Sequence, residues 1–448
     1  MARSRRRDFD TPRERRVATA GVPRPDRESS LPASEAVARQ RRFDCVYFVG
    51  NRYRGYSLVE AARSADRAEP RHDGTPGGLR FPPLLAGEDA GEVLQRAGAD
   101  RRRREGRAAT EQLMVLDQES LGRQVLPTVA AVRELLPGAA ILLMLPESFR
   151  HLSTAQIKER SAVDRVAVWS GQVEDLAAMV WLMQDERTAT ADLSKGIPAL
   201  MLVEDEPGLY GQFLSLIYTE LLSRTRDLVP ARTPADSLWR YLDHRPRILL
   251  AESFEEGMLV LGQYAGHLIG VITDLQFPIT GEVQADAGIK LCELTRALRP
   301  TLPLIVQSNA PRSPAELNRV SAFYLNKRSE TWLDDLRRIM LNFFGFGDFV
   351  FRDEVGVELA SARNVEELRD RLARVPLASI LFHGRRNHIS TWLYIHGAHD
   401  LARCLRPLQG DGEWLRRRVL GLLDRYLAGD DLTALEPGEL RDDGASVA

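Results

Sequence analysis

Short apolar runs with strand character alternate with helix-length amphipathic segments along most of this chain. Such alternation is typical of α/β domains built on a mainly parallel sheet. The pattern occurs twice, at 43–190 and at 196–345, and a mainly helical region at 346–448 follows. We therefore predict two tandem α/β domains, each a doubly wound five-stranded parallel sheet, followed by a helical region.

The apolar runs and the amphipathic segments give the following elements. In the first copy they predict strands at 43–49, 112–116, 140–145 and 165–169, and helices at 121–136 and 172–187. In the second copy they predict strands at 198–203, 247–251, 268–273, 303–307 and 322–325, and helices at 207–225, 254–264, 285–298, 314–320 and 330–343. The stretch 65–108 is long for a compact domain and is expected to be partly disordered, and 228–246 is interpreted as an inserted loop.

Composition fits several soluble domains. A chain of 448 residues exceeds the size that one hydrophobic core usually serves, and its formal net charge of -2 does not favour a nucleic-acid partner. Residues 1–42 are rich in Arg, Pro, Ser and Ala and poor in aromatic and β-branched residues, which predicts a disordered basic tail.

The cellular compartment is inferred from the cysteines and from the apolar runs. Cys45, Cys292 and Cys404 are odd in number and far apart, so the sequence suggests neither a disulfide framework nor a zinc site. No apolar run approaches the roughly 20 residues that a membrane span needs, and the first residues lack the apolar stretch of a signal peptide. We expect a cytoplasmic protein without a membrane partner.

Carboxylates follow two strands of the second predicted sheet. Glu204 and Asp205 come directly after the strand at 198–203, and Asp274 ends the strand at 268–273. Parallel sheets of this kind bind ligands beyond the carboxyl ends of their strands, so these side chains are expected to converge. Three converging carboxylates repel one another unless a cation lies among them, and an oxygen-only cluster suits Mg²⁺.

Two further side chains complete a site for phosphoryl transfer. Ser308 follows the strand at 303–307 and can donate a hydrogen bond to a phosphoryl oxygen, and Lys327 follows the last strand and supplies a positive charge. Phosphoryl transfer needs mainly positioning and charge neutralisation. An acceptor carboxylate, a metal ion, a hydroxyl and a lysine therefore suffice for transfer to Asp274.

These residues resemble the receiver domains of two-component response regulators, a flavodoxin-like family. LVEDEP carries the acidic pair, VITDLQFPITG the acceptor aspartate and the proline-containing loop, QSNA the hydroxyl residue and YLNK the lysine. The resemblance implies that a histidine kinase or another phosphodonor phosphorylates Asp274. It also implies that the chain is a phosphoacceptor, not an enzyme beyond self-phosphorylation and self-dephosphorylation.

The same resemblance assigns two more roles and reveals one departure. The backbone carbonyl of Gln276 would complete the metal ligands, and Tyr324 would be the aromatic switch that couples phosphorylation to the last strand and helix. Arg328 stands where receiver domains usually have a proline after the lysine, which puts the shape of that loop in doubt.

The first copy has fewer of these features. Asp117 follows QLMVL as Asp274 follows GVIT, but the strand at 43–49 ends in Gly-Asn, Pro146 follows the strand at 140–145, and VAVWSG contains no lysine. We interpret 43–190 as a degenerate receiver-like domain with a scaffold or dimerisation role, and a homodimer is a possible consequence.

The C-terminal region contains a cluster of four histidines, His383, His388, His396 and His399. Their spacings do not match a zinc site, so packing or capping roles are expected. The neighbourhood of His383, Arg386 and Asn387 has a faint similarity to a sensor-kinase histidine box, but no nucleotide-binding domain follows.

A longer string of segments, from DRVAVWSG to HISTWLYIHGAHDLA, resembles the tandem receiver-like N-terminal region of phosphoenolpyruvate synthase and pyruvate phosphate dikinase-like proteins. We expect no counterpart of their ATP-grasp domain in these 448 residues. The first hypothesis is a phosphorelay response regulator. The alternatives are a regulatory subunit or relative of such a phosphotransfer enzyme, and a DNA-binding regulator acting through the C-terminal helices, although RRNHISTWLYIHG is too irregular for a clear helix-turn-helix.

Overall fold

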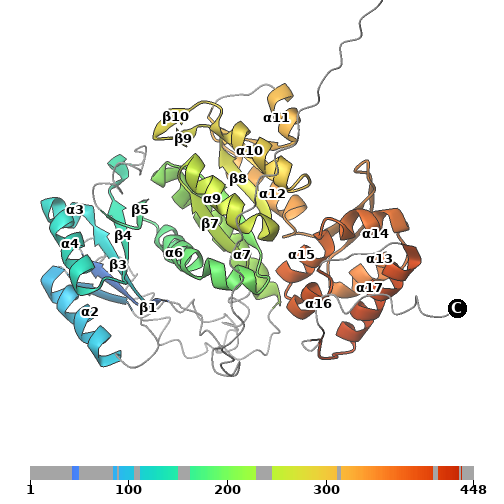
Figure 1. Ribbon diagram of the computed structural model, residues 1–448, viewed down its shortest axis with the longest axis horizontal. Coiled ribbons are helices and arrows are strands. Elements are labelled where there is room, and N and C mark those ends of the chain that lie inside the picture. The colour runs from blue at the N-terminus through green and yellow to red at the C-terminus, as the bar shows by residue number, and fades with distance from the viewer. Residues whose placement is uncertain are drawn as a thin grey trace, which may run out of the picture. The chain divides into compact units, whose positions relative to one another are not determined.

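The first parallel sheet of the computed structural model has the strand order β2-β1-β3-β4-β5 (Figure 1). Its strands are β1 (Phe43–Val49), β2 (Leu84–Gly87), β3 (Glu111–Asp117), β4 (Ala140–Leu145) and β5 (Arg165–Val168). Four of them confirm the predicted strands. The fifth, β2, is short and was missed, because it and helix α2 (Ala90–Arg104) lie within the stretch that was expected to be partly disordered. That expectation was wrong for these two elements.

The other helices that the structure describes in this part are α3 (Gln118–Leu121), α4 (Val125–Leu135), α6 (Val173–Ser194) and the short 3-10 helices η2 (Gly122–Gln124) and η3 (Glu147–Phe149). The predicted helix at 121–136 is divided, since a glycine with positive φ, Gly122, ends α3. Helix α6 runs seven residues further than the predicted end at 187.

The second sheet is also parallel, with the order β12-β11-β8-β6-β7. Its strands are β6 (Ala199–Val203), β7 (Arg247–Ala251), β8 (Leu268–Asp274), β11 (Leu304–Ser308) and β12 (Phe323–Asn326). Its helices are α7 (Pro207–Leu228), α9 (Phe254–Tyr264), the 3-10 helix η4 (Ala265–His267), α10 (Ala287–Leu298), α11 (Pro314–Val320) and α12 (Trp332–Phe343). All five predicted strands are present, and the α/β class with parallel sheets is confirmed. Numbered within each sheet, both have the order 2-1-3-4-5, which is consistent with flavodoxin-like folds.

A small hairpin after β8 was not predicted. Strands β9 (Phe277–Ile279) and β10 (Glu282–Gln284) pair antiparallel. The two residues between them, Thr280 and Gly281, both have positive φ, as a type I′ turn requires. The hairpin buries Phe277 completely and so holds the chain close to Asp274.

The C-terminal part begins with an antiparallel hairpin of β13 (Phe349–Arg352) and β14 (Glu358–Ala362). Among the described residues that follow it are the helices α13 (Val365–Leu372), α14 (Leu377–Gly384), α15 (His388–Ile395), α16 (His399–Cys404) and α17 (Gly412–Leu427) (Figure 1). They enclose an apolar core of their own, centred on Phe351, Trp392 and Val419.

Helix α6 follows the first sheet in the chain but packs against α7 and β7 of the second. One apolar core includes Leu142 of β4, Leu182 of α6 and Leu250 of β7. Buried ion pairs reinforce this contact: Arg245 lies 2.7 Å from Asp185, and an Arg247 nitrogen lies 2.8 Å from Asp192. Side chains from both sheets therefore surround α6.

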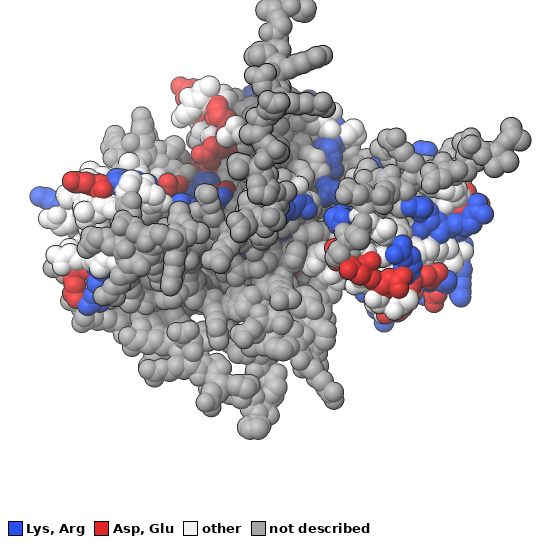
Figure 2. Space-filling view, turned by 60° about the horizontal axis from the view of Figure 1, so that its bottom comes forward, with Lys and Arg blue, Asp and Glu red and all other residues white. Residues whose placement is uncertain are grey.

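The structure describes residues 43–49, 84–87, 90–104, 111–149, 162–228, 245–309, 314–406, 412–432 and 435, which all belong to one contact-linked unit, 40–448. The predicted tail at 1–42 and most of the predicted inserted loop lie outside the described residues. No helix within these ranges has both the length and the apolar character to cross a membrane. On the face shown in Figure 2, acidic and basic side chains of the described residues are interspersed.

Candidate functional site

Four of the predicted site residues come together at the carboxyl edge of the second sheet. Strand β6 ends at Val203, so Glu204 and Asp205 lie in the short loop before Pro207, the first residue of α7. Proline is favoured at the first position of a helix because it lacks the N–H that would go unpaired there. Asp274 is the last residue of β8, and Lys327 follows β12. Because β6 and β8 are neighbours in a parallel sheet, their carboxyl ends meet.

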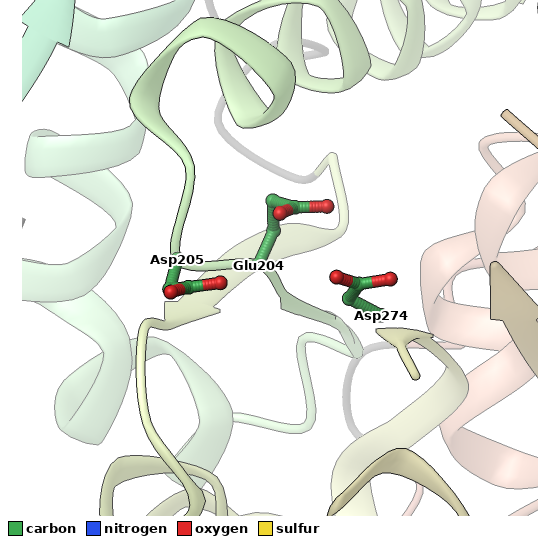
Figure 3. A group of neighbouring side chains, drawn as sticks. All are labelled: Glu204, Asp205 and Asp274. Atoms are coloured by element: carbon green, nitrogen blue, oxygen red, sulfur yellow. The ribbon is translucent and has the colours of Figure 1, made fainter. Parts of the chain in front are cut away.

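The three carboxylates form a compact cluster. One oxygen from each of Glu204, Asp205 and Asp274 lies within 4.8 Å of the others, and within the described ranges this is the one group of at least three possible metal-binding side chains. Figure 3 shows the carboxylates turned toward a common space between the ends of β6 and β8. Glu204 is fully buried and Asp205 is 6% exposed, so two of the three carboxylates are largely removed from water.

Lys327 is the cation of this cluster. Its Nζ lies 2.6 Å from Oε2 of Glu204 and 3.1 Å from Oδ1 of Asp274, and its side chain is only 4% exposed. The amide of Gln307 also donates to Oε2 of Glu204, at 2.9 Å, and the backbone N–H of Leu275 donates to Oδ1 of Asp274, at 2.7 Å. Oδ2 of Asp274 accepts no hydrogen bond from the residues that the structure describes, so this oxygen is available for a ligand.

The cluster holds more negative charge than one lysine can neutralise. Burial, together with the charge of Asp274, raises the pKa of Glu204 to about 8, against the opposing effect of Lys327. Burial and the Asp274 charge raise the pKa of Asp205 to about 6, and burial raises the pKa of Asp274 as well. For Lys327, burial would lower the pKa, but the neighbouring carboxylates outweigh it and raise the pKa. Raised carboxyl pKa values beside a lysine mark a site that lacks positive charge.

Mg²⁺ fits this donor set. The ligands on offer are hard carboxylate oxygens of Glu204, Asp205 and Asp274. A divalent cation would replace the proton that burial favours on Glu204 and would offset the repulsion among the three carboxylates. The arrangement can therefore hold a metal ion beside a carboxylate oxygen that remains open to a phosphoryl group.

The other predicted site residues are Ser308, Gln276 and Tyr324, and none of them is a member of the carboxylate cluster. Ser308 is buried and ends β11 at the same edge, where its backbone carbonyl accepts a hydrogen bond from the backbone N–H of Lys327 at 3.0 Å. Gln276 lies between β8 and β9 with an exposed side chain. Tyr324 lies on β12, three residues before Lys327, and packs half-buried against the core that contains Val306. It is not part of the carboxylate cluster.

The loop after Lys327 closes without the proline that receiver domains usually have there. The backbone N–H of Arg328 donates to Oδ1 of Asn326 at 3.0 Å, and that of Ser329 donates to the Asn326 carbonyl at 3.0 Å. Asparagine stabilises turns in this way because its short side chain mimics a backbone carbonyl. A proline at 328 would have no N–H to make the bond that Arg328 donates to Asn326.

Two residues that shape the site were not predicted from the sequence. Gln307 is fully buried and binds Glu204, yet a polar residue near a strand end carries no distinctive signal. Gly288 lies in the first turn of α10, and a Cβ there would stand 2.2 Å from the Asp274 carbonyl oxygen. The start of α10 can approach the β8 terminus only because this residue has no side chain.

Asp117 has a different environment at the end of β3. Its carboxylate caps α3, accepting hydrogen bonds from the backbone N–H of Glu119 at 3.3 Å and from the Ser120 hydroxyl. Such a cap satisfies a helix N-terminus and occupies both oxygens.

The four C-terminal histidines all make packing or hydrogen-bond contacts within the helical region. Nε2 of His383 accepts a hydrogen bond from the Arg352 backbone N–H at 2.8 Å, and its Nδ1 lies 3.1 Å from Nδ1 of His388. His396 stacks on Trp392, and His399 lies against Tyr394.

The chain matches no protein-family model, and no curated protein resembles it at a significant level.

Proposed function

We propose that residues 196–345 form a receiver domain of a phosphorelay response regulator and that Asp274 is its phosphoacceptor. The observation that carries the proposal is the convergence of Asp274 with Glu204, Asp205 and Lys327 at one edge of a parallel sheet. Structural ion pairs also bring acids and lysines together. Here, however, three carboxylates cluster around one lysine that pairs with only two of them, Glu204 and Asp274, and one oxygen of Asp274 remains open.

In the proposed reaction, Oδ2 of Asp274 attacks the phosphorus of a phosphohistidine or an acyl phosphate. The new P–O bond forms as the bond to the donor breaks, and the leaving group keeps the electron pair. Glu204, Asp205, Asp274 and the backbone carbonyl of Gln276 would hold Mg²⁺, which supplies positive charge to the phosphoryl oxygens. Lys327, already beside Asp274, neutralises the developing charge, and the Ser308 hydroxyl donates to a phosphoryl oxygen.

We further propose that residues 43–190 form a degenerate receiver-like domain. Asp117 supports this reading because its carboxylate already serves as a helix cap, and a phosphoryl group on it would remove that cap. Tyr324 is proposed as the switch, since it lies on the same short strand that leads to Lys327.

The test is incubation of the full chain with acetyl phosphate and Mg²⁺, followed by intact mass measurement. We expect a phosphate-sized adduct on the wild type, none on Asp274→Asn, and none on the wild type when EDTA removes the metal. Asp117→Asn is the matched control, because it changes the corresponding aspartate of the first sheet, and it should still gain the adduct. An adduct that persists on Asp274→Asn would overturn the assignment.

A further inference from the structure

A cavity of about 410 Å³ lies at the opposite edge of the second sheet, where β8 and β11 begin. Leu268 and Pro303 line one side, and Phe382, His388 and Trp392 from helices α14 and α15 line the other. A volume of this size is typical of small-molecule sites, which usually measure about 300–1,000 Å³. Strand β8 runs from this cavity to Asp274, so the two sites lie at opposite ends of the same strand.

The lining of the cavity has an excess of positive charge. Four arginines line it, Arg296, Arg299, Arg352 and Arg386, against a single acid, Asp348. Arg352 is paired with Glu358 at 2.9 Å, and Asp348 is paired with Arg363 at 3.8 Å.

None of the other three arginines makes an ion pair within the described ranges. Arg296 donates to four backbone carbonyls, those of Val320, Pro300, Leu302 and Ser321. Within the described ranges, Arg299 donates to the Ala265 carbonyl and Arg386 to the Phe382 carbonyl, and neither makes an ion pair. Burial lowers the pKa of Arg299, with no neighbouring carboxylate to oppose it. A partly buried guanidinium without a counter-charge is costly, and an anion would offset that cost.

The histidine pair adds hydrogen bonding to the cavity without adding charge. Because Nε2 of His383 accepts from a backbone N–H, its proton lies on Nδ1 and is donated to Nδ1 of His388. The remaining nitrogen of His388, Nε2, then carries a proton. Burial lowers the pKa of His383 to about 3 and that of His388 to about 4, so both rings are neutral near pH 7.

The remaining walls are largely aromatic. Phe323, Phe344, Phe349 and Trp392 line the cavity, and the Arg386 guanidinium lies 4.0 Å from the centre of the Phe382 ring. Stacking of this kind holds a guanidinium in place while its edge stays free for an oxyanion. An apolar body with a single charged end would match this combination of walls.

We propose that this cavity binds a small organic anion, whose carboxylate or phosphate contacts Arg299 and Arg386 and whose apolar body packs against the aromatic walls. The site goes beyond the proposed phosphoacceptor function and uses none of its residues. A bound ligand would touch both the beginning of the second sheet and helices α14 and α15.

The test is isothermal titration calorimetry of the full chain with three probes that share a naphthalene ring. They are 2-naphthoate, 2-naphthyl phosphate and the neutral 2-naphthylmethanol. We expect at least one anionic probe to bind at least about tenfold more tightly than the alcohol, the scale of a hydrogen bond to a charged group. Inorganic phosphate, which has no apolar body, should bind more weakly than that probe. The two anionic arms distinguish a carboxylate ligand from a phosphate ester.

Variants locate the binding. Arg386→Gln should lower the affinity for the anionic probe by about tenfold or more and leave the affinity for the alcohol unchanged. Substitution of the neighbouring exposed residue, Arg385→Gln, should leave both affinities at the wild-type level. Thr391→Phe narrows the cavity, so it should lower the affinity for the anionic probe and for the alcohol. This variant replaces Arg386→Gln in the test if Arg386→Gln does not fold. The proposal is overturned if no anionic probe binds, if the alcohol or inorganic phosphate binds as well as the anionic probes, or if the folded variants keep wild-type affinity.

Discussion

Replacement of Asp185 by asparagine should destabilise the chain strongly, although it changes only one atom. Asp185 lies on α6, is 1% exposed and receives four hydrogen bonds from the second sheet and its helices. Oδ2 accepts from Arg245 Nη1 at 2.7 Å, from the Tyr218 hydroxyl at 2.8 Å and from the Ile248 backbone N–H at 3.0 Å. Oδ1 accepts from Arg245 Nη2 at 2.7 Å.

The size of the effect follows from these contacts. An asparagine with its carbonyl oxygen in the Oδ2 position keeps three of the bonds, but its NH₂ group then faces Arg245 Nη2, which places two donors against each other. The substitution also leaves the buried Arg245 without its bidentate counter-ion. Removing one partner of a buried ion pair costs about 3–5 kcal/mol, and we expect a loss of unfolding free energy in this range.

A urea titration monitored by circular dichroism measures this loss of unfolding free energy. Hydrogen exchange of the peptide that contains Ile248 adds a local reading, because that amide loses protection if the contact between α6 and β7 opens. The matched control is Glu174→Gln, an exposed acid on the same helix, which should change the unfolding free energy by less than about 0.5 kcal/mol.

A double variant separates the ion pair from simple packing. Asp185→Leu combined with Arg245→Met removes both charges, so it should be less destabilised than the sum of the two single variants. If Asp185→Asn unfolds at the same urea concentration as Glu174→Gln, or if the two single effects add without coupling, the buried ion pair does not anchor α6.

Three further predictions concern the acid cluster and the histidine pair. Lys327→Met should slow phosphorylation by acetyl phosphate on the order of 100-fold, the scale for losing a charge-stabilising donor, and should tighten Mg²⁺ binding in titrations because a competing cation is gone. Gly288→Ala should lower the unfolding free energy by about 1–3 kcal/mol, because its Cβ collides with backbone, whereas Gly262→Ala, with open space around it in α9, should stabilise by about 0.5–1 kcal/mol. In the folded chain burial lowers the pKa of His383 to about 3 and that of His388 to about 4, below the ordinary 6.5. The unfolded chain therefore binds protons more readily, so the contribution of these histidines to the free energy of unfolding is complete above pH 6.5 and is lost as pH falls toward 4. Each unit of pKa shift corresponds to about 1.4 kcal/mol of unfolding free energy. Urea unfolding should therefore give a lower unfolding free energy at pH 5 than at pH 7, and this difference should be smaller in His383→Gln.

Contrary results would be clear in each case. Equal phosphorylation rates for wild type and Lys327→Met would remove the lysine from the chemistry. Equal stabilities of the two alanine variants would mean that the start of α10 can shift without cost. A His383→Gln variant with the wild-type loss of stability between pH 7 and pH 5 would assign that loss to other groups.

The strands of the second sheet were predictable because each is a short apolar run between polar loops, and because both faces of a parallel sheet are buried. The convergence of Glu204, Asp205 and Asp274 followed from the same reasoning, since polar residues after the strands of one parallel sheet must meet at one edge. The sequence did not reveal which carboxylate oxygens Lys327 contacts, or that Gln307 and Lys327 donate to the same oxygen of Glu204. Those details depend on side-chain directions, which tertiary packing decides.

Elements that depend on distant partners were harder to predict. Strand β2 has four residues and gains its place by pairing with β1, across a stretch with no helical or strand periodicity. The β9–β10 hairpin has three-residue strands, and its signal is confined to Thr280 and Gly281. In each case the local sequence is too short to carry a periodic pattern, so the pairing partner determines the structure.

Helix α6 shows why a domain boundary inferred from the sequence pattern can differ from the way the helices and sheets pack in space. A boundary between 190 and 196 follows from the end of one α/β pattern and the start of the next. Yet Asp185 and Asp192 lie on this helix and bind Arg245 and Arg247 beside β7. Arg165 of β5 likewise donates to the Leu250 carbonyl of β7 at 3.0 Å. Periodicity identifies a helix and its apolar face. It does not reveal that side chains of two sheets pack around that helix, or that its buried acids bind arginines more than 50 residues away in the sequence.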